Sequence, residues 1–182
     1  ATEGVTEQDS SLLGMVQDSG KSIIVAINKC EELGKIEKER IKSELSRKFN
    51  FIDYVEYHYI SAKNNTGIKY LIKKIDAIIK SLDIDFSTPR LTGMLQELIV
   101  KHPPKIVRGR RIKLRYMHLG QTNPIRFIIH GNQTKNVPDS YRRYICKSLR
   151  KKLKLLATPV LIEFRQNENP YVKEKEYNKR VR

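Results

Sequence analysis

The chain has 182 residues, which is enough for one or two domains, and its net charge of +16 makes it strongly basic. No apolar stretch approaches the roughly 18 residues that would cross a bilayer, and the N-terminus shows no signal-peptide pattern. The two cysteines and four histidines show no metal-ligand spacing. We therefore expect a cytoplasmic protein with free thiols and no bound metal, and we exclude a membrane-spanning protein.

The charge is distributed unevenly along the chain. Residues 1–85 contain 13 basic and 14 acidic residues, a net of −1, whereas residues 86–182 contain 23 and 6, a net of +17. The whole excess therefore lies in the second half. This asymmetry predicts a polyanionic partner for that half, with nucleic acid as the first candidate and an anionic membrane surface as the second.

Hydrophobic periodicity in the first half predicts alternating helices and strands. We expect helices over residues 6–19, 35–49 and 67–81, and strands over residues 22–27 and 55–60. The last helix should turn an apolar stripe inward, made of Ile68, Leu71, Ile72, Ile75 and Ile78 or Ile79. This order predicts the end of an α/β domain with a parallel sheet.

The second half begins after a predicted linker, residues 83–89, across which the composition changes from balanced to basic. Its predicted elements are a helix over 89–101, strands over 111–118 and 125–130, a helix over 138–156 and a strand over 159–164. In the first of these strands, alternation places Ile112, Leu114 and Tyr116 on one face. The order α-β-β-α-β predicts a small α+β domain.

Two polar motifs follow the two predicted strands of the first half, namely Asn28-Lys29-Cys30-Glu31 and Ser61-Ala62-Lys63. Parallel strands end at one edge of a sheet, where doubly wound sheets bind ligands, so we expect the motifs to meet there. A carboxylate at Glu31 can accept both N1–H and N2–H₂ of guanine, and Asn28 can read the base edge and tie the two loops together. The stem of Lys29 can cover the base, and backbone N–H groups of residues 61–63 can reach the guanine carbonyl oxygen.

Asn-Lys-x-acid is a short motif that a polar turn after a strand would also explain. The second motif, at its separation along the chain, favours a guanine-nucleotide site over that alternative. The predicted ligand-contacting residues are Asn28, Lys29, Glu31, Ser61, Ala62 and Lys63.

A sequence that imitates a phosphate-binding loop runs from Gly14 to Gly20-Lys21-Ser22, but five residues separate its glycines where the motif needs four. It also follows a predicted helix and opens a strand, the reverse of the motif's context. No other Gly-Lys-Ser/Thr and no Asp-x-x-Gly occurs. We therefore predict no catalytic residue, no ligands for the β- and γ-phosphates, and no metal ligands in this chain.

Ten basic side chains of the second half are predicted to contact nucleic acid. Five lie at helical spacing on the predicted helix over 138–156, where they repel one another unless an anion neutralises them. A solvated charged face is the alternative. The ten are Arg108, Arg110, Arg111, Lys113, Arg115, Arg143, Lys147, Arg150, Lys151 and Lys154. Tyr116, Tyr141 and Tyr144 could stack on bases, but we favour core packing for them.

Seven segments together resemble the Der (EngA) family of bacterial tandem GTPases. They are residues 1–9, 28–31, 60–63, 103–111, 130–133, 138–144 and 169–171. The resemblance implies an incomplete doubly wound P-loop GTPase domain, its C-terminal half spanning residues 1–82, and an α+β KH-like domain over residues 90–170. A basic tail, residues 171–182, follows. KH domains clamp RNA with Gly-x-x-Gly, which this chain lacks, so we expect contacts to structured RNA rather than sequence-specific reading.

The resemblance also implies a function. It implies a parent GTPase that binds GTP and GDP, with Mg²⁺, and acts in the assembly of the large ribosomal subunit. The implied partners are the ribosomal RNA of that subunit and the missing GTPase domains, with no membrane. We expect the chain to be a fragment with an unpaired sheet edge and no GTPase activity alone. The alternative is a non-enzymatic RNA-binding module whose N-terminal half is a scaffold.

The family usually has Asp at the position of Glu31, so the carboxylate here stands one methylene farther from the backbone. The charge is unchanged. We therefore expect that guanine selectivity is retained and that the affinity is weaker.

Overall fold

The structure is a computed structural model that describes residues 5–49, 52–107 and 109–166. The chain divides into two compact units. The first comprises residues 1–85, 121–125 and 146–161, and the second comprises residues 86–120, 126–145 and 162–182. This grouping differs from the domain limits expected from the sequence, which stay a prediction.

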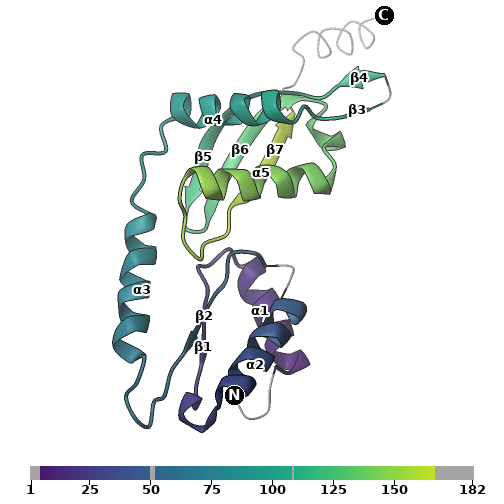
Figure 1. Ribbon diagram of the computed structural model, residues 1–182. Helices are drawn as coiled ribbons and strands as arrows, with labels where there is room; N and C mark the ends of the chain where they lie inside the picture. The colour runs from purple at the N-terminus through teal and green to yellow at the C-terminus, as the bar shows by residue number, and fades with distance from the viewer. Residues whose placement is uncertain (1–4, 50–51, 108, 167–182) are drawn as a thin grey trace, which may run out of the picture. The chain divides into compact units, whose positions relative to one another are not determined.

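The first unit contains a two-stranded parallel sheet with helices on both sides (Figure 1). Its elements are α1 (Glu7–Asp18), β1 (Ile24–Ile27), α2 (Lys35–Lys48), β2 (Glu56–Tyr59) and α3 (Ile68–Ser81). Ile24 pairs with Glu56 and Ile27 with Tyr59. The predicted elements are confirmed to within two residues at each end. In Figure 1, α1 and α2 lie on one side of the strands and α3 on the other.

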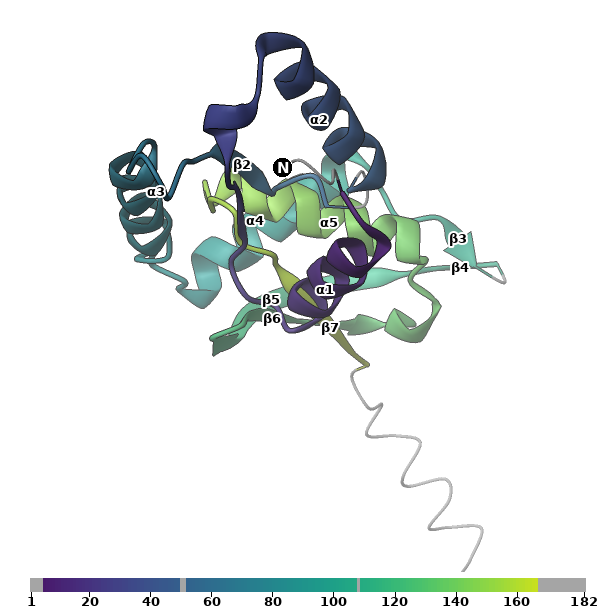
Figure 2. The same ribbon diagram turned by 90° about the horizontal axis from the view of Figure 1, so that it is seen from below.

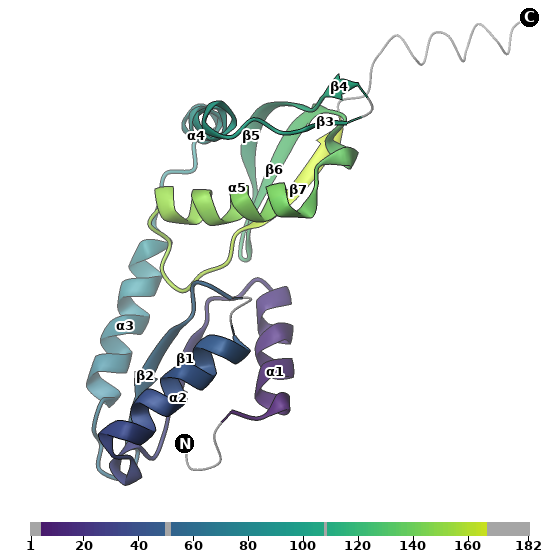
Figure 3. The same ribbon diagram turned by 45° about the vertical axis from the view of Figure 1, so that its right-hand side comes forward.

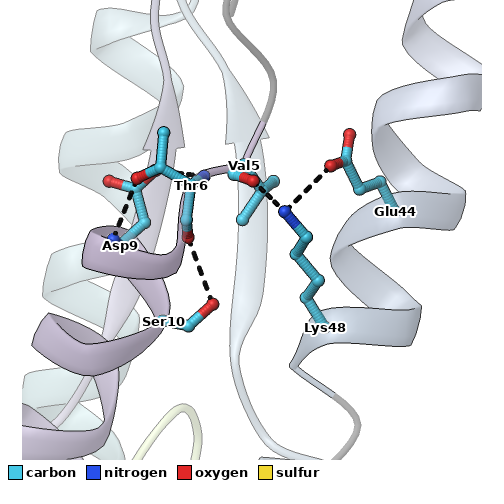
Figure 4. Close-up of polar contacts among 6 residues, drawn as sticks. All are labelled: Val5, Thr6, Asp9, Ser10, Glu44 and Lys48. Atoms are coloured by element: carbon cyan, nitrogen blue, oxygen red, sulfur yellow. Dashed lines mark hydrogen bonds and ion pairs between the residues drawn. The ribbon is translucent and has the colours of Figure 1, made fainter.

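Polar contacts fix the start of α1 against the end of α2 (Figure 4). Thr6 caps α1, because its hydroxyl accepts the Asp9 N–H at 3.1 Å and the Asp9 carboxylate accepts the Thr6 N–H at 2.9 Å. Lys48 of α2 donates to the Val5 carbonyl and pairs with Glu44 at 3.2 Å. These contacts hold the two helices over one apolar core, made of Leu13, Ile23, Ile27, Ile41, Leu45, Phe49 and Ile52.

Helix α3 differs from its prediction. Ile72 and Ile75 were expected to face inward, but they are exposed; of the two alternatives Ile78 and Ile79, Ile78 is the buried one. The physical reason is that β1 and β2 alone offer a narrow surface. Contacts between helix α3 and β2 include an ion pair of 3.1 Å between Lys74 and Glu56 and an edge-on ring contact of Tyr70 with His58.

The remaining elements follow the predicted order α-β-β-α-β. They are α4 (Thr88–Lys101), β5 (Lys113–Thr122), β6 (Ile125–Asn132), α5 (Asp139–Lys152) and β7 (Leu161–Gln166), with the strands in the order β5-β6-β7. A short antiparallel ribbon of β3 (Ile106–Val107) and β4 (Arg110–Arg111) was not predicted (Figure 2). Two 3-10 turns, Cys30–Glu32 and Thr134–Asn136, were also not predicted.

Helices α4 and α5 lie along one face of the β5-β6-β7 sheet (Figure 3). Thr92 of α4 exchanges hydrogen bonds of 3.2 Å with the backbone of Met117, and the Tyr144 hydroxyl of α5 donates to the Leu98 carbonyl at 3.2 Å. The side chains beneath the helices are fully or almost fully buried, among them Leu91, Leu95, Leu98, Met117, Phe127, Ile129 and Ile145. The helices therefore bury the inward-facing side chains of the strands on this face of the sheet.

Two predictions for this part of the chain are wrong. Tyr116 was expected on the same face of the strand as Leu114. Leu114 and Met117 are both buried, however, so two residues rather than one separate consecutive inward positions. Tyr116 therefore lies on the other face and is 38% exposed. Such an extra residue shifts the alternation of a strand. Helix α5 ends at Lys152, four residues before the predicted end, and Lys154 has a left-handed backbone with φ 55°. Lys154 therefore does not continue the helical basic face.

Candidate functional site

The two polar motifs meet at the carboxyl ends of β1 and β2. The Ile60 N–H donates to the Ile27 carbonyl at 2.9 Å, and the Cys30 N–H donates to the Ile60 carbonyl at 3.1 Å. The parallel ladder therefore continues past both strands and brings residues 28–31 beside residues 61–63. The predicted meeting of the motifs at one sheet edge is confirmed.

Asn28 ties the two loops together, as predicted. Its Oδ1 atom accepts the Ala62 N–H at 3.0 Å and the Lys29 N–H at 2.8 Å. Because Oδ1 is occupied twice, the amide nitrogen Nδ2 with its two hydrogens is the part of this side chain left for a ligand. Guanine presents the acceptors N7 and O6, so Nδ2 is chemically matched to that edge of the base.

Lys29 adopts a left-handed backbone with φ 62° and precedes the 3-10 turn Cys30–Glu32. This turn reverses the chain just beyond the sheet edge and presents Glu31 to solvent. The side chain of Lys29 is exposed, consistent with a stem that covers a bound base.

Glu31 is held by the second motif. A hydrogen bond from the Ser61 hydroxyl is the main cause that lowers the pKa of Glu31, and the charges of Lys63 and Lys29 lower it further. Ser61 is buried, and its Oγ also accepts the Asn64 N–H at 3.0 Å. The lowered pKa favours the ionised carboxylate, an acceptor that suits the paired N1–H and N2–H₂ donors of guanine. The role of the Ser61 hydroxyl was not predicted, because only its backbone was considered.

The backbone N–H groups of residues 61–63 are mostly engaged within the protein. Ser61 donates its N–H to the Thr66 carbonyl at 2.9 Å, and Ala62 donates to Asn28. Lys63 is the member of this motif whose N–H has no partner within the described residues. The Lys63 N–H is thus the first candidate for the guanine carbonyl oxygen, with that of Ala62 available if the base displaces Asn28 Oδ1.

The basic side chains predicted to contact nucleic acid differ in how available they are to a ligand. Arg108 and the side chain of Arg110 lie outside the described residues. Arg111, Lys113, Arg115, Arg143 and Lys151 are exposed, as is Lys154 beyond the end of α5. These exposed cations are the ones available to an anion.

Lys147 and Arg150 are instead engaged inside the first compact unit. Lys147 pairs with Asp53 at 2.8 Å, and Arg150, which is 9% exposed, pairs with the same carboxylate and lies 4.7 Å from the Tyr54 ring. Although burial opposes the shift, hydrogen bonds from Lys147 and Arg150 lower the pKa of Asp53. We therefore leave these two cations out of the proposed interface.

No three His, Cys, Asp or Glu side chains within the described residues gather as a possible metal site. We accordingly assign no Mg²⁺ ligand and derive no step through a metal. Neither Cys30 nor Cys146 is in a disulfide, and both are half-buried. Among helices in the described residues, none has the length and apolar character needed to cross a membrane.

A fragment of a P-loop GTPase domain followed by a KH-like domain is the class that this arrangement defines, and comparison with protein families gives the same result. Residues 1–81 match the family model described as "Elongation factor Tu GTP binding domain". Residues 86–165 match the model described as "KH-domain-like of EngA bacterial GTPase enzymes, C-terminal".

Curated relatives identify the particular group. Proteins named GTPase Der are 45% identical to this chain over 171 residues in Stutzerimonas stutzeri and over 175 residues in Legionella pneumophila strain Corby. These matches cover 94% and 96% of this chain but 34% and 38% of the relatives. The chain thus matches the C-terminal part of the Der (EngA) GTPases, and the resemblance predicted from the sequence is confirmed.

The chain spans about a third of the length of the curated relatives that it matches. Among solved structures, a crystal structure of Era from Aquifex aeolicus bound to GDP and AlF4⁻ aligns with 97% of this chain and 66% of its own, at 21% identity and a TM-score of 0.36. A likeness at this TM-score adds nothing to the family matches.

Proposed function

We propose that this chain is the guanine-recognising and RNA-binding part of a GTPase that acts in the assembly of the large ribosomal subunit in the cytoplasm. The observation that carries the guanine part is the hydrogen bond from the Ala62 N–H to Asn28 Oδ1. It joins the two motifs into one site whose donors and acceptors match guanine, with Nδ2 of Asn28 for N7 or O6 and Glu31 for the opposite edge. The similarity to proteins named GTPase Der supports GTP as the nucleotide.

The GTPase domain is completed by a segment that packs beside β1. A cleft with a volume of about 560 Å³ runs along β1 between α1 and α2. It is lined mainly by apolar side chains such as Leu12, Leu13, Val16 and Ile41. Within the described residues β1 pairs with β2 alone, so its second edge is free to accept a strand. An exposed strand edge beside an apolar cleft is suited to another strand of the same sheet.

Hydrolysis requires this completion. Catalysis of phosphoryl transfer depends mostly on positioning the phosphates and on electrostatic stabilisation, and this sequence contains no phosphate-binding loop for that purpose. We therefore expect the chain alone to neither bind nor hydrolyse GTP measurably, and the full-length parent to bind GTP in preference to ATP. GTP turnover by these 182 residues alone would contradict the proposal, as would equal binding of ATP and GTP by the parent.

The RNA-binding part is the basic second half. Arg143 and Lys151 lie on α5 with exposed side chains, and Arg111, Lys113 and Arg115 are exposed on β4 and β5. With a net charge of +17 on residues 86–182, an interface to RNA phosphates is electrostatically favoured. Ribosomal RNA of the large subunit is the proposed partner, as the family resemblance of the sequence implies.

The test compares two sets of variants by their binding to large-subunit ribosomal RNA. Arg143→Glu and Lys151→Glu should weaken binding and reduce the slope of log affinity against log salt by about one for each lost phosphate contact. Lys42→Glu, an exposed lysine on α2, makes the same charge change and should have no such effect. An unchanged slope in Arg143→Glu and Lys151→Glu would contradict a phosphate interface at α5.

The alternative function is a non-enzymatic RNA-binding module in which the first half is a scaffold. The same proteins decide between the two. If Asn28→Ala and Glu31→Ala in the parent leave GTP binding and assembly of the large subunit unchanged while the α5 variants abolish RNA binding, the scaffold function is correct and the guanine part of the proposal is wrong.

A further inference from the structure

Three rings lie on the face of the β5-β6-β7 sheet that α4 and α5 do not cover. They belong to Tyr116 and His118 of β5 and to His130 of β6. Phe127 and Ile129 on β6 are fully buried, and successive side chains of a strand alternate between faces, so His130 points away from the helices. We call these three side chains the ring cluster.

The rings of the cluster are nearly parallel. The Tyr116 and His130 ring centroids are 4.5 Å apart with an interplanar angle of 6°, and those of His118 and His130 are 5.1 Å apart at 24°. Tyr116 and His118 are 6.2 Å apart, which is less than a straight column would give, so the rings form a triangle on the sheet. Tyr116 is 38% exposed, and both imidazoles are half-buried.

Charged side chains border the ring cluster. The Glu163 carboxylate accepts a hydrogen bond of 2.7 Å from Arg165 Nε, which is the main cause that lowers the pKa of Glu163, and Arg126 and His130 lie within electrostatic reach of it. The Glu163 carboxylate is thus already paired with a cation. Arg126 of β6 is half-buried and Arg165 of β7 is exposed, and both guanidinium groups act on the Glu163 carboxylate, as His130 of the cluster does.

We propose that the ring cluster is a stacking platform for the bases of single-stranded RNA. The inference rests on the proposed RNA-binding function and adds a second mode of contact to it. Aromatic rings combined with cationic side chains are the means by which proteins bind single strands without sequence preference, because every base has a π-face. Arg126 and Arg165 supply the cations for the backbone on either side of the base.

Charge favours RNA over a protein partner as the occupant of this face. The second half of the chain carries a net charge of +17, and the ring cluster consists of one tyrosine and two histidines, whose rings carry polar atoms. An acidic protein surface would also satisfy the arginines, but it would not require three near-parallel rings.

The test measures the binding of two fluorescein-labelled octanucleotides to the whole chain. One is oligo(A) RNA, and the other is an abasic ribose-phosphate chain of the same length and charge. The platform predicts that oligo(A) binds about tenfold more tightly than the abasic chain and that Tyr116→Ala removes this difference. Tyr116→Phe retains a ring and should keep it. Tyr70→Ala, which removes an exposed tyrosine from α3, is the matched control and should keep it too.

A second readout is the chemical shift of the His118 and His130 imidazole C–H groups. Ring currents from a stacked adenine should move both resonances on addition of oligo(A), and the abasic chain should not move them. Equal affinities for the two oligonucleotides, or a preference that survives Tyr116→Ala, would overturn the platform and leave the phosphate interface intact. Failure of both to bind would overturn the proposed RNA-binding function as well. Shifts caused by the purified GTPase part of the parent, and not by oligo(A), would identify a protein-docking face instead.

Discussion

Replacing Asn28 separates the two roles that the structure gives to one side chain. Asn28→Asp keeps an oxygen that can accept the N–H groups of Ala62 and Lys29, now at 3.0 and 2.8 Å, but it loses the Nδ2 donors. Asn28→Ala loses both. We therefore expect the aspartate variant to retain the tie between the loops and to lose the reading of guanine, and the alanine variant to lose both properties.

The magnitude follows from two hydrogen bonds. A protein hydrogen bond contributes about 0.5–1.5 kcal/mol net, and Asn28 is exposed, so water replaces much of what is lost. We estimate about 1 kcal/mol for Asn28→Ala, equivalent to roughly fivefold faster exchange of the Ala62 amide hydrogen. Asn28→Asp should leave this exchange unchanged. Asn64→Ala, an exposed amide in the neighbouring loop, serves as the control and should also leave it unchanged.

The binding arm uses the full-length parent and a fluorescent guanine nucleotide. Loss of a good base-edge contact costs roughly 1–3 kcal/mol, so both variants should bind at least about fivefold more weakly than the unchanged protein. Normal guanine binding by Asn28→Asp would refute the assignment of Nδ2 as the reading group. Rapid Ala62 exchange in Asn28→Asp would refute the assignment of Oδ1 as the tie.

Two further results are expected. Because the Ser61 hydroxyl lowers the pKa of Glu31, the Glu31 carboxylate stays ionised through mildly acidic pH. Guanine binding by the parent should therefore be constant from neutral pH to about pH 5 and fall only below the ordinary carboxyl pKa of 4.5. A fall above pH 5 in a pH titration of binding would contradict this. A Cβ at Gly131 would lie 2.1 Å from the Lys113 carbonyl oxygen, so Gly131→Ala should lower the free energy of unfolding, measured in urea, by about 2 kcal/mol or more. Gly93 lies in open space on α4, so Gly93→Ala should raise the free energy of unfolding by about 0.5–1 kcal/mol. Equal effects of the two substitutions would refute the close approach of β5 and β6.

The sequence predicted the strands and the motifs because their signals are local. An apolar run such as residues 23–27 ends at Asn28 without ambiguity, and a parallel pair brings the next motif to the same edge whatever the rest of the fold. The hydrogen bond of Asn28 to Ala62 follows from that topology. The Ser61 hydroxyl contact to Glu31 does not, because it depends on how the loop turns back through the Ser61–Thr66 bridge.

The failures share another cause, since each depends on tertiary context. Strict alternation places Tyr116 with Leu114, and only the structure shows the extra residue before Met117 that moves Tyr116 to the opposite face. The apolar stripe of α3 correctly predicted an amphipathic helix. Ile72 and Ile79 are nevertheless exposed, because the sheet beneath the helix is narrow. Periodicity in the sequence gives no information about the width of that sheet. Arg150 lies at the helical spacing of a basic face and is nevertheless paired with Asp53, a residue almost a hundred positions away in the sequence.

Magnitudes also decide what the guanine motifs can do without the phosphate half. Base-edge contacts of this kind are worth roughly 1–3 kcal/mol, while a dissociation constant of 1 mM already requires about 4 kcal/mol. The contacts of Asn28 and Glu31 are therefore too weak to capture a nucleotide by themselves, yet they suffice to discriminate guanine from adenine by about tenfold or more once other groups hold the phosphates. For the same reason, substitutions at these two residues should change the ratio of GTP to ATP affinity in the parent more than they change the affinity for the shared triphosphate. This chain thus supplies the selectivity for guanine, and the segment that completes the sheet supplies the affinity for the phosphates. For that physical reason, we expect that neither part works alone.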